Sequence, residues 1–212
     1  MSRREINTMI LGHNGIRNKI AKEWDIANMN ILHWSRELEK LSKYFLIDCQ
    51  VRRDPCDFLV FKDITIGQNV FFSKASPGSR WVGRTIRHWY SQLGYDIKNW
   101  DQFREAEKKN ISLTEITQMI WPSVEFIGCA AAKMFEGYMV TCYYHPSISK
   151  NWNVFSHGKG CTKCSRERLT CSRDFTKLCG LDVPYNIGRG LANQAVIIYL
   201  VQFIIVNIFN SF

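Results

Sequence analysis

The sequence has no feature that marks a nucleic-acid-binding protein or a repeat protein. Its 212 residues include 28 Lys and Arg against 19 Asp and Glu, a formal net charge of +9, but no long basic run. The basic residues do not alternate with aromatic residues at a repeating spacing, and no internal repeat or low-complexity tract is present. We therefore expect no nucleic-acid partner. We interpret the charge as a solvated basic surface, with contact to an anionic membrane surface as the alternative.

The signatures of common hydrolases are also missing. No serine stands in a nucleophile-elbow pattern, and no cysteine left over from the disulfides predicted below has a suitable histidine near it. Packing in helices or positions in loops explain the five histidines better than catalysis does: His13, His33, His88, His145 and His157. The sequence therefore predicts no catalytic residue.

The first residues lack the apolar segment of a secretory signal peptide. The stretch "MSRREINTMILGHNG" starts with charged residues, and its apolar residues do not form a run of the required length. This absence conflicts with the cysteine content, which indicates an oxidising compartment. We give the cysteines more weight, and we expect the natural chain to begin upstream of Met1 or at a different start site.

The cysteines predict a framework of disulfides. There are eight, an even number: Cys49, Cys56, Cys129, Cys142, Cys161, Cys164, Cys171 and Cys179. The last four lie in a short, mostly polar segment that cannot build its own core, so covalent bonds are the natural way to hold it. Zinc is the alternative, because "CTKC" is a CxxC motif, but Cys171 and Cys179 do not form a second one.

The end of the chain is an uncharged segment. Its 18 residues begin at Ala195 and end at Phe212. As a helix they would span about 27 Å, which is marginal for a bilayer core, and Gln202 and Asn207 weaken the match. Small residues before the segment also fit the signal for a glycolipid anchor. Membrane attachment of some kind is one prediction for this tail, and a buried strand or helix docked on the domain is the alternative.

Hydrophobic periodicity predicts an α+β fold with helices packed on a central, largely antiparallel sheet. The expected helices cover residues 8–24, 29–50, 79–97 and 112–121, and the expected strands cover residues 63–73, 125–134 and 137–146. Asn30 or Ser35 is the expected N-cap of the second helix, and Ser112 or Thr114 that of the fourth. Pro122 ends the fourth helix, and the last two strands should place Cys129 opposite Cys142.

Six short motifs in this order resemble those of one known family. They are "HNGIR" from His13, "LHWSREL", "CQVRRDPC", "IGQNV", "TQMIW" followed by "GCAAAKM", and "MVTCYYHP". Over about residues 8–150 the chain resembles the CAP superfamily of cysteine-rich secretory, antigen 5 and pathogenesis-related 1 proteins. It is most similar to the antigen-5, venom allergen-like branch of arthropods.

The resemblance implies a three-layer α-β-α sandwich in residues 1–150, here lacking its native N-terminus. A cysteine-stapled extension in residues 151–182 follows, then a linker and hydrophobic tail in residues 183–212. It also implies secretion and the disulfides Cys49–Cys56 and Cys129–Cys142. Among Cys161, Cys164, Cys171 and Cys179 three pairings stay open. Antigen-5 proteins carry an N-terminal, cysteine-bearing extension that this chain lacks, which agrees with a missing start.

Many members of the family have a central cleft in which two histidines and two acidic residues can hold a divalent metal. At the matching positions this chain has Arg53, Gln68, Gln92 and Glu115. A guanidinium has no free lone pair, and glutamine offers only a neutral amide oxygen. The resemblance therefore implies a degenerate cleft with no metal and no other cofactor.

The four substituted cleft positions allow two arrangements. In the first, Arg53 pairs with Glu115 and either Gln68 or Gln92 bridges them in a closed polar network. In the second, all four are surface substitutions in a relaxed cleft. The residues do not choose between these arrangements.

The function we expect is that of a non-enzymatic extracellular CAP-domain protein of antigen-5 type. Its partner would be an extracellular protein or a lipid, and the tail from Ala195 to Phe212 could attach it to a membrane. The alternatives are a metal-dependent hydrolase that uses the cleft and a carrier of lipid or sterol. Asn110, in "NIS", is an expected N-glycosylation site of such a secreted chain.

Overall fold

The computed structural model describes residues 1–47, 60–61, 64–74, 78, 80–94, 96–109, 111–149 and 151–182. The helices are α1 (Arg3–Glu23), α2 (Arg36–Ile47), α3 (Trp81–Tyr90), α4 (Trp100–Lys108) and α5 (Thr114–Ile120). The strands are β1 (His33–Trp34), β2 (Val60–Phe61), β3 (Ile64–Thr65), β4 (Gly67–Ser73), β5 (Phe126–Met134) and β6 (Gly137–His145). Five of the predictions above lie outside the described residues: those for Cys49, Arg53, Cys56, Asn110 and the tail that begins at Ala195.

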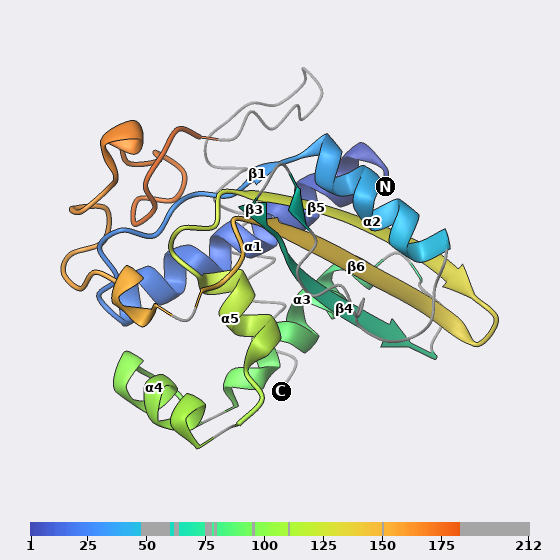
Figure 1. Ribbon diagram of the computed structural model, residues 1–212, viewed down its shortest axis with the longest axis horizontal. Helices are drawn as coiled ribbons and strands as arrows, with labels where there is room; N and C mark the ends of the chain where they lie inside the picture. Colours follow the sequence, from blue (N-terminus) through green and yellow to red (C-terminus); the bar gives the residue numbers. More distant parts are fainter. Residues whose placement is uncertain are drawn as a thin grey trace.

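The central sheet has four strands in the order β1-β5-β6-β4, and Figure 1 shows β4, β5 and β6 running side by side through the molecule. β6 pairs antiparallel with both β4 and β5, whereas the short β1 runs parallel to β5. Strands β2 and β3 form a separate antiparallel pair. Gly137, at the β5–β6 turn, has φ +141°, and a Cβ there would lie 2.0 Å from the carbonyl oxygen of Ser73. Only glycine fits this turn beside the edge strand.

Successive side chains of β6 point to opposite faces of the sheet and are buried on both. Val140, Cys142 and Tyr144 belong to the larger core, which includes residues of α1, α3 and α5. Tyr143 belongs to a smaller cluster with Leu38 of α2 on the opposite face. The sheet therefore lies between two helical layers (Figure 1), which confirms the predicted α+β, three-layer sandwich.

Helices α1 and α2 each begin where a side chain of the preceding residue caps them. The α1 helix starts five residues earlier than predicted, because Ser2 and Glu5 form a capping box with each other. At α2 the hydroxyl of Ser35 accepts from the backbone N–H of Leu38 at 3.2 Å, so Ser35 is the cap and the alternative, Asn30, is wrong. The residues before Ser35 are extended instead, because β1 pairs with β5 there.

The start of α5 differs from the prediction. Neither Ser112 nor Thr114 caps it: Leu113 stands at the N-cap position and offers no side-chain hydrogen bond. The N–H of Ile116, in the first turn, instead donates to the side-chain Oε1 of Gln92 at 3.0 Å. The capping acceptor thus comes from another element, where the local sequence around α5 gives no sign of it.

Helix α4 is absent from the sequence prediction. The side chain of Asn99 caps it by accepting from the N–H of Gln102 at 3.0 Å. Only Phe103 and Ala106 are buried along its nine residues. Such a narrow apolar stripe gives a weak periodic signal, and this explains the omission.

The extension, residues 151–182, has no strand or helix beyond two 3-10 turns. Two disulfides hold it, Cys161–Cys171 and Cys164–Cys179, which is one of the three pairings left open. Its backbone also pairs with the segment after α1: Cys179 donates to the carbonyl of Met29, and Ile31 donates to that of Cys179, both at 2.8 Å. Among the helices described here, none is long and apolar enough to cross a membrane.

Candidate functional site

Gln92 and Glu115, two of the predicted cleft residues, lie together. Gln92 is in the 3-10 turn that follows α3, and Glu115 is in the first turn of α5. The Nε2 group of Gln92 donates to Oε2 of Glu115, while Oε1 of Gln92 accepts from the N–H of Ile116. The side-chain amide of Gln92 therefore connects the end of α3 both to the carboxylate of Glu115 and to the first turn of α5. Both ends of this side chain are engaged.

A buried chain of hydrogen bonds continues inward from Glu115. The Nδ2 group of Asn69 donates to the backbone carbonyl of Glu115 at 2.9 Å and to the hydroxyl of Tyr144 at 3.2 Å. That hydroxyl lies 2.9 Å from Nε2 of His13, whose Nδ1 lies 2.8 Å from the carbonyl oxygen of Met9. A carbonyl only accepts, so His13 donates through Nδ1 and accepts through Nε2 from Tyr144. The donor directions thus agree along the chain.

The two titratable side chains in this series of hydrogen bonds, His13 and Tyr144, stay neutral at physiological pH. His13 and Tyr144 are both fully buried. Burial lowers the pKa of His13 to about 4 and raises the pKa of Tyr144 well above its ordinary value. Packing and hydrogen bonding, the role expected for His13, therefore fits the structure. This arrangement orients side chains and does not supply an acid or a base to solvent.

Gln68 lies on the other face of the sheet. Its Nε2 donates to Thr141 Oγ1 at 3.3 Å and to the hydroxyl of Tyr143 at 3.2 Å. In the β4–β6 register Gln68 is opposite Tyr143, on the side that α2 covers, while Asn69 is opposite Cys142 on the side of the Gln92–Glu115 pair. The structure thus places Gln92 beside Glu115, and since Arg53 lies outside the described residues, the predicted network through Arg53 stays a prediction. The resemblance matched Gln68 to a cleft position. Successive side chains of a strand point to opposite faces of the sheet, so the neighbouring Asn69, and not Gln68, lies on the face of the Gln92–Glu115 pair.

A buried arginine of the "HNGIR" motif, for which the sequence predicted no role, supports this site. Arg17 lies one helical turn after His13 on α1 and is fully buried. Its guanidinium donates only to main-chain carbonyls, those of Asn30, Met119, Trp121, Pro122 and Val124, at 2.7–3.3 Å. Burial lowers its pKa to about 9, which still leaves it charged at neutral pH. The i, i+4 spacing of His13 and Arg17 in "HNGIR" is the signal that could have shown their shared inward face.

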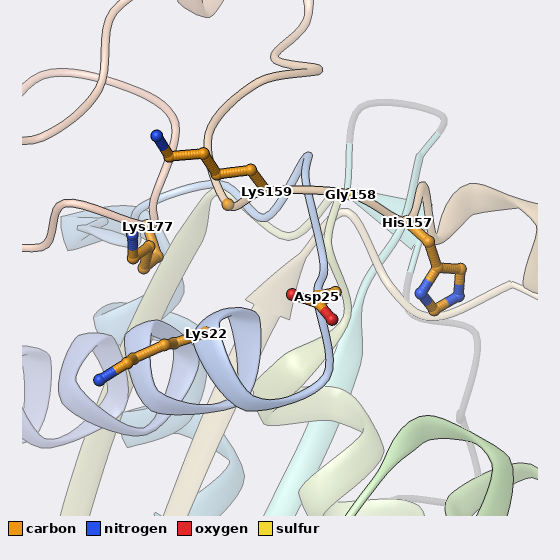
Figure 2. A pocket seen from close by; sticks show the side chains of 7 residues that line it. Lys22, Asp25, His157, Gly158, Lys159 and Lys177 are labelled. Atoms are coloured by element: carbon orange, nitrogen blue, oxygen red, sulfur yellow. The ribbon is translucent and has the colours of Figure 1, made fainter.

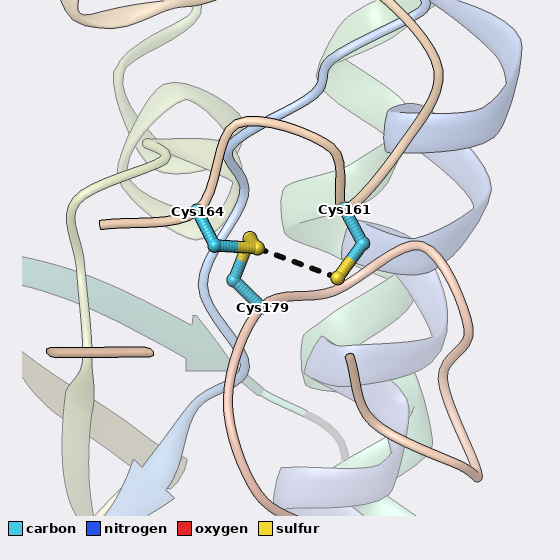
Figure 3. A group of neighbouring side chains, drawn as sticks. All are labelled: Cys161, Cys164 and Cys179. Atoms are coloured by element: carbon cyan, nitrogen blue, oxygen red, sulfur yellow. Dashed lines mark hydrogen bonds between the residues drawn. A yellow bond between two sulfur atoms is a disulfide. The ribbon is translucent and has the colours of Figure 1, made fainter. Parts of the chain in front are cut away.

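The cysteines of the extension form one further cluster of possible ligands. Within the described residues, the sulfurs of Cys161, Cys164 and Cys179 are the group close enough to share a metal ion. Figure 3 shows Cys164 bonded to Cys179, with the sulfur of Cys161 3.3 Å from that of Cys164. Cys161 is itself bonded to Cys171. Zinc binds cysteine as the thiolate, so cysteines in these disulfides cannot bind zinc. The disulfides predicted in the extension and at Cys129–Cys142 are confirmed.

Solved structures with the same arrangement define the class of fold. NaASP2, solved with Zn²⁺, gives a TM-score of 0.67 at 18% identity, covering 85% of this chain and 97% of that one. Hookworm platelet inhibitor gives 0.65 at 20% identity, covering 86% and 93%. Na-ASP-1 gives 0.67, and there the match spans 47% of that longer chain. The sandwich described above is the CAP fold.

Sequence comparison gives the family. The model of CAP, the cysteine-rich secretory protein family, matches residues 12–144, and the chain belongs to this family. GLIPR1-like protein 1 of Mus musculus is 23% identical over 184 residues, 82% of this chain and 72% of the relative. Venom allergen 5 of Dolichovespula arenaria is 25% identical over 159 residues, 68% and 75% of the two chains.

Proposed function

We propose that this chain is a non-enzymatic, extracellular CAP-domain binding protein of the antigen-5 type. Three disulfides in the described residues support an oxidising compartment. The similarity to venom allergen 5 proteins supports the antigen-5 type. The observation that carries the proposal is the engagement of Gln92 with both Glu115 and the start of α5.

This engagement works against a metal at the cleft. A metal on Glu115 would compete with the amide of Gln92 for the carboxylate oxygen. An amide cannot become an anion, so Gln92 would add only a weak neutral ligand. Moving Gln92 would also remove the acceptor for the N–H of Ile116 and leave the first turn of α5 short of a cap. NaASP2 was solved with Zn²⁺, so the fold can accept zinc, but Gln92 and Glu115 give this chain a poor ligand set.

Zinc titration of the oxidised, full chain by calorimetry tests the proposal. Wild type and Glu115→Ala should both give no saturable heat at micromolar zinc. Glu136→Ala, which removes an exposed carboxylate at the β5–β6 turn, is the matched control. Binding of one zinc ion per chain at micromolar concentration, lost in Glu115→Ala and kept in Glu136→Ala, would contradict the proposal and favour a metal-dependent hydrolase. Thiol counting before each run is needed because reduced Cys161, Cys164 and Cys179 could bind zinc themselves.

A further inference from the structure

A basic pocket lies where the extension crosses the end of α1. Its volume is about 650 Å³, and its lining combines α1 and the segment just after it with the two loops of the extension that meet there. The lining residues are Lys22, Asp25, His157, Gly158, Lys159, Gly160 and Lys177, most of which Figure 2 labels. The pocket is separate from the Gln92–Glu115 pair, which joins the end of α3 to α5.

The pocket carries more positive than negative charge. Within the part of the chain that the structure describes, no carboxylate forms an ion pair with Lys22, Lys159 or Lys177. Figure 2 shows these three side chains on one side of the pocket, with Asp25 between them and His157. The His157 ring packs against Trp100 with centroids 5.2 Å apart. An anion on the lysine side of Asp25 would therefore be close to three lysine side chains.

The position of Lys177 is built into the fold. Its N–H donates to Oδ1 of Asn18 on α1 at 2.9 Å, and its side chain is half-buried. The stem lies against Gly160, where a Cβ would come within 2.9 Å of both Cβ and Cδ of Lys177. The absence of a side chain at Gly160 thus lets the lysine lie in its present place.

The backbone around the pocket is also fixed. Gly158, with φ +139°, donates to the carbonyl of Asp25 at 2.8 Å, and Lys163 donates to that of Ala27 at 3.1 Å. The two disulfides of the extension hold the same loops. A ligand would therefore meet cations whose backbone is already ordered, which lowers the entropic cost of binding.

We propose that this pocket binds a sulfated segment of an extracellular polysaccharide. Several lysines around one cavity suit closely spaced anionic groups, which lysine recognises as point charges. His157 is the single aromatic residue of the lining, and its ring already packs against Trp100. The lining therefore offers no aromatic surface on which nucleic-acid bases could stack. In an oxidising compartment the abundant polyanions are sulfated glycans. The proposal rests on the extracellular part of the proposed function, but not on the absence of a metal from the cleft.

Binding of a fluorescent heparin hexasaccharide to the full, oxidised chain tests this proposal. EDTA is present throughout, so the result does not depend on whether the cleft takes zinc. Wild type should bind, and raising the salt concentration should weaken the binding. Lys22→Ser with Lys159→Ser should weaken it about tenfold, because two exposed ion pairs are lost. Lys40→Ser with Lys133→Ser, at exposed sites on α2 and β5, changes the net charge equally and should leave binding unchanged.

A neutral substitution separates shape from charge. Gly160→Ala should weaken hexasaccharide binding about threefold, because the new Cβ displaces Lys177 and weakens the ion pair of Lys177 with the hexasaccharide. Circular dichroism and thermal unfolding verify that each variant is folded. Equal losses in both lysine pairs, or equally tight binding of desulfated heparin or of single-stranded DNA, would overturn the proposal. So would a wild-type chain that does not bind the hexasaccharide.

Discussion

Two disulfides hold the 32 residues of the extension, whereas the described part of the sandwich contains one, Cys129–Cys142, buried within its sheet. The sandwich is stable mainly through side chains packed between helices and sheet. The extension contributes only a few side chains to that core, among them Phe155, Phe175 and Leu178. A segment with so little apolar burial needs covalent bonds to keep one shape. The two regions thus show two ways to fix a backbone.

The polar side chains of the two regions also differ in what they bond to. In the sandwich, Gln92 bonds to Glu115, Asn69 bonds to the carbonyl of Glu115 and to Tyr144, and the hydrogen bonds continue through buried His13 to the backbone. In the extension and the adjoining end of α1, lysine residues line a pocket. Polar side chains that satisfy each other define structure, and cations left for solvent are open to a ligand. The experiments below test this contrast, from the largest expected effect to the smallest.

Removing the buried arginine should damage the sandwich most. Arg17→Met leaves several buried main-chain carbonyls without a donor, so the free energy of unfolding should fall by about 3–5 kcal/mol. Urea denaturation measures this loss. Arg3→Met, at the exposed start of α1, is the matched control and should change stability by less than about 0.5 kcal/mol. A loss below about 1 kcal/mol for Arg17→Met would mean that α5 does not depend on this cation.

Removing a disulfide from the extension should have a local effect. Cys164→Ala with Cys179→Ala opens a loop of 15 residues, which we expect to cost about 3 kcal/mol. Hydrogen exchange should accelerate in residues 151–182, while β5 and β6 keep their protection. Equal acceleration in the sheet would show that the sandwich depends on the extension, and the contrast between the two regions would then be wrong.

Acid should destabilise the sandwich through His13. Its pKa is about 4 when folded and near 6.5 when unfolded, so below pH 6.5 the unfolded chain binds a proton that the folded chain does not. Stability from this group is complete above pH 6.5 and falls by about 3 kcal/mol as the pH drops to 4. Urea denaturation across this range measures the loss. His13→Gln should flatten the dependence, and the exposed His157→Gln should not; the same slope in His13→Gln would assign the loss to other groups.

Local patterns in the sequence predicted much of the sandwich. The β5–β6 hairpin and the opposed Cys129 and Cys142 follow from two β-rich runs joined by a turn at Glu136, all within a short stretch. The first and third helices likewise show their apolar stripes directly. Each of these features depends on residues close together in the chain, so the pattern contains the needed information.

The features that the sequence did not predict depend on distant contacts. The cap of α5 comes from Gln92, 24 residues before the N–H that it accepts from. The face on which Gln68 lies depends on the register between β4 and β6, and a shift of one residue would reverse it. The choice among the three pairings of the extension depends on how its loops, which have no regular secondary structure to fix a register, fold back on one another and on the segment after α1. None of these contacts leaves a periodic signal in one sequence.

A double-mutant cycle tests most directly whether Gln92 and Glu115 are energetically coupled, as the proposed function requires. Urea denaturation gives the free energy of unfolding for wild type, Gln92→Ala, Glu115→Ala and the double variant. A hydrogen bond to a charged group should give a coupling energy of about 1.5 kcal/mol between the two positions. Additive losses, within about 0.3 kcal/mol, would mean that the side chains act independently in a relaxed cleft and would contradict the account.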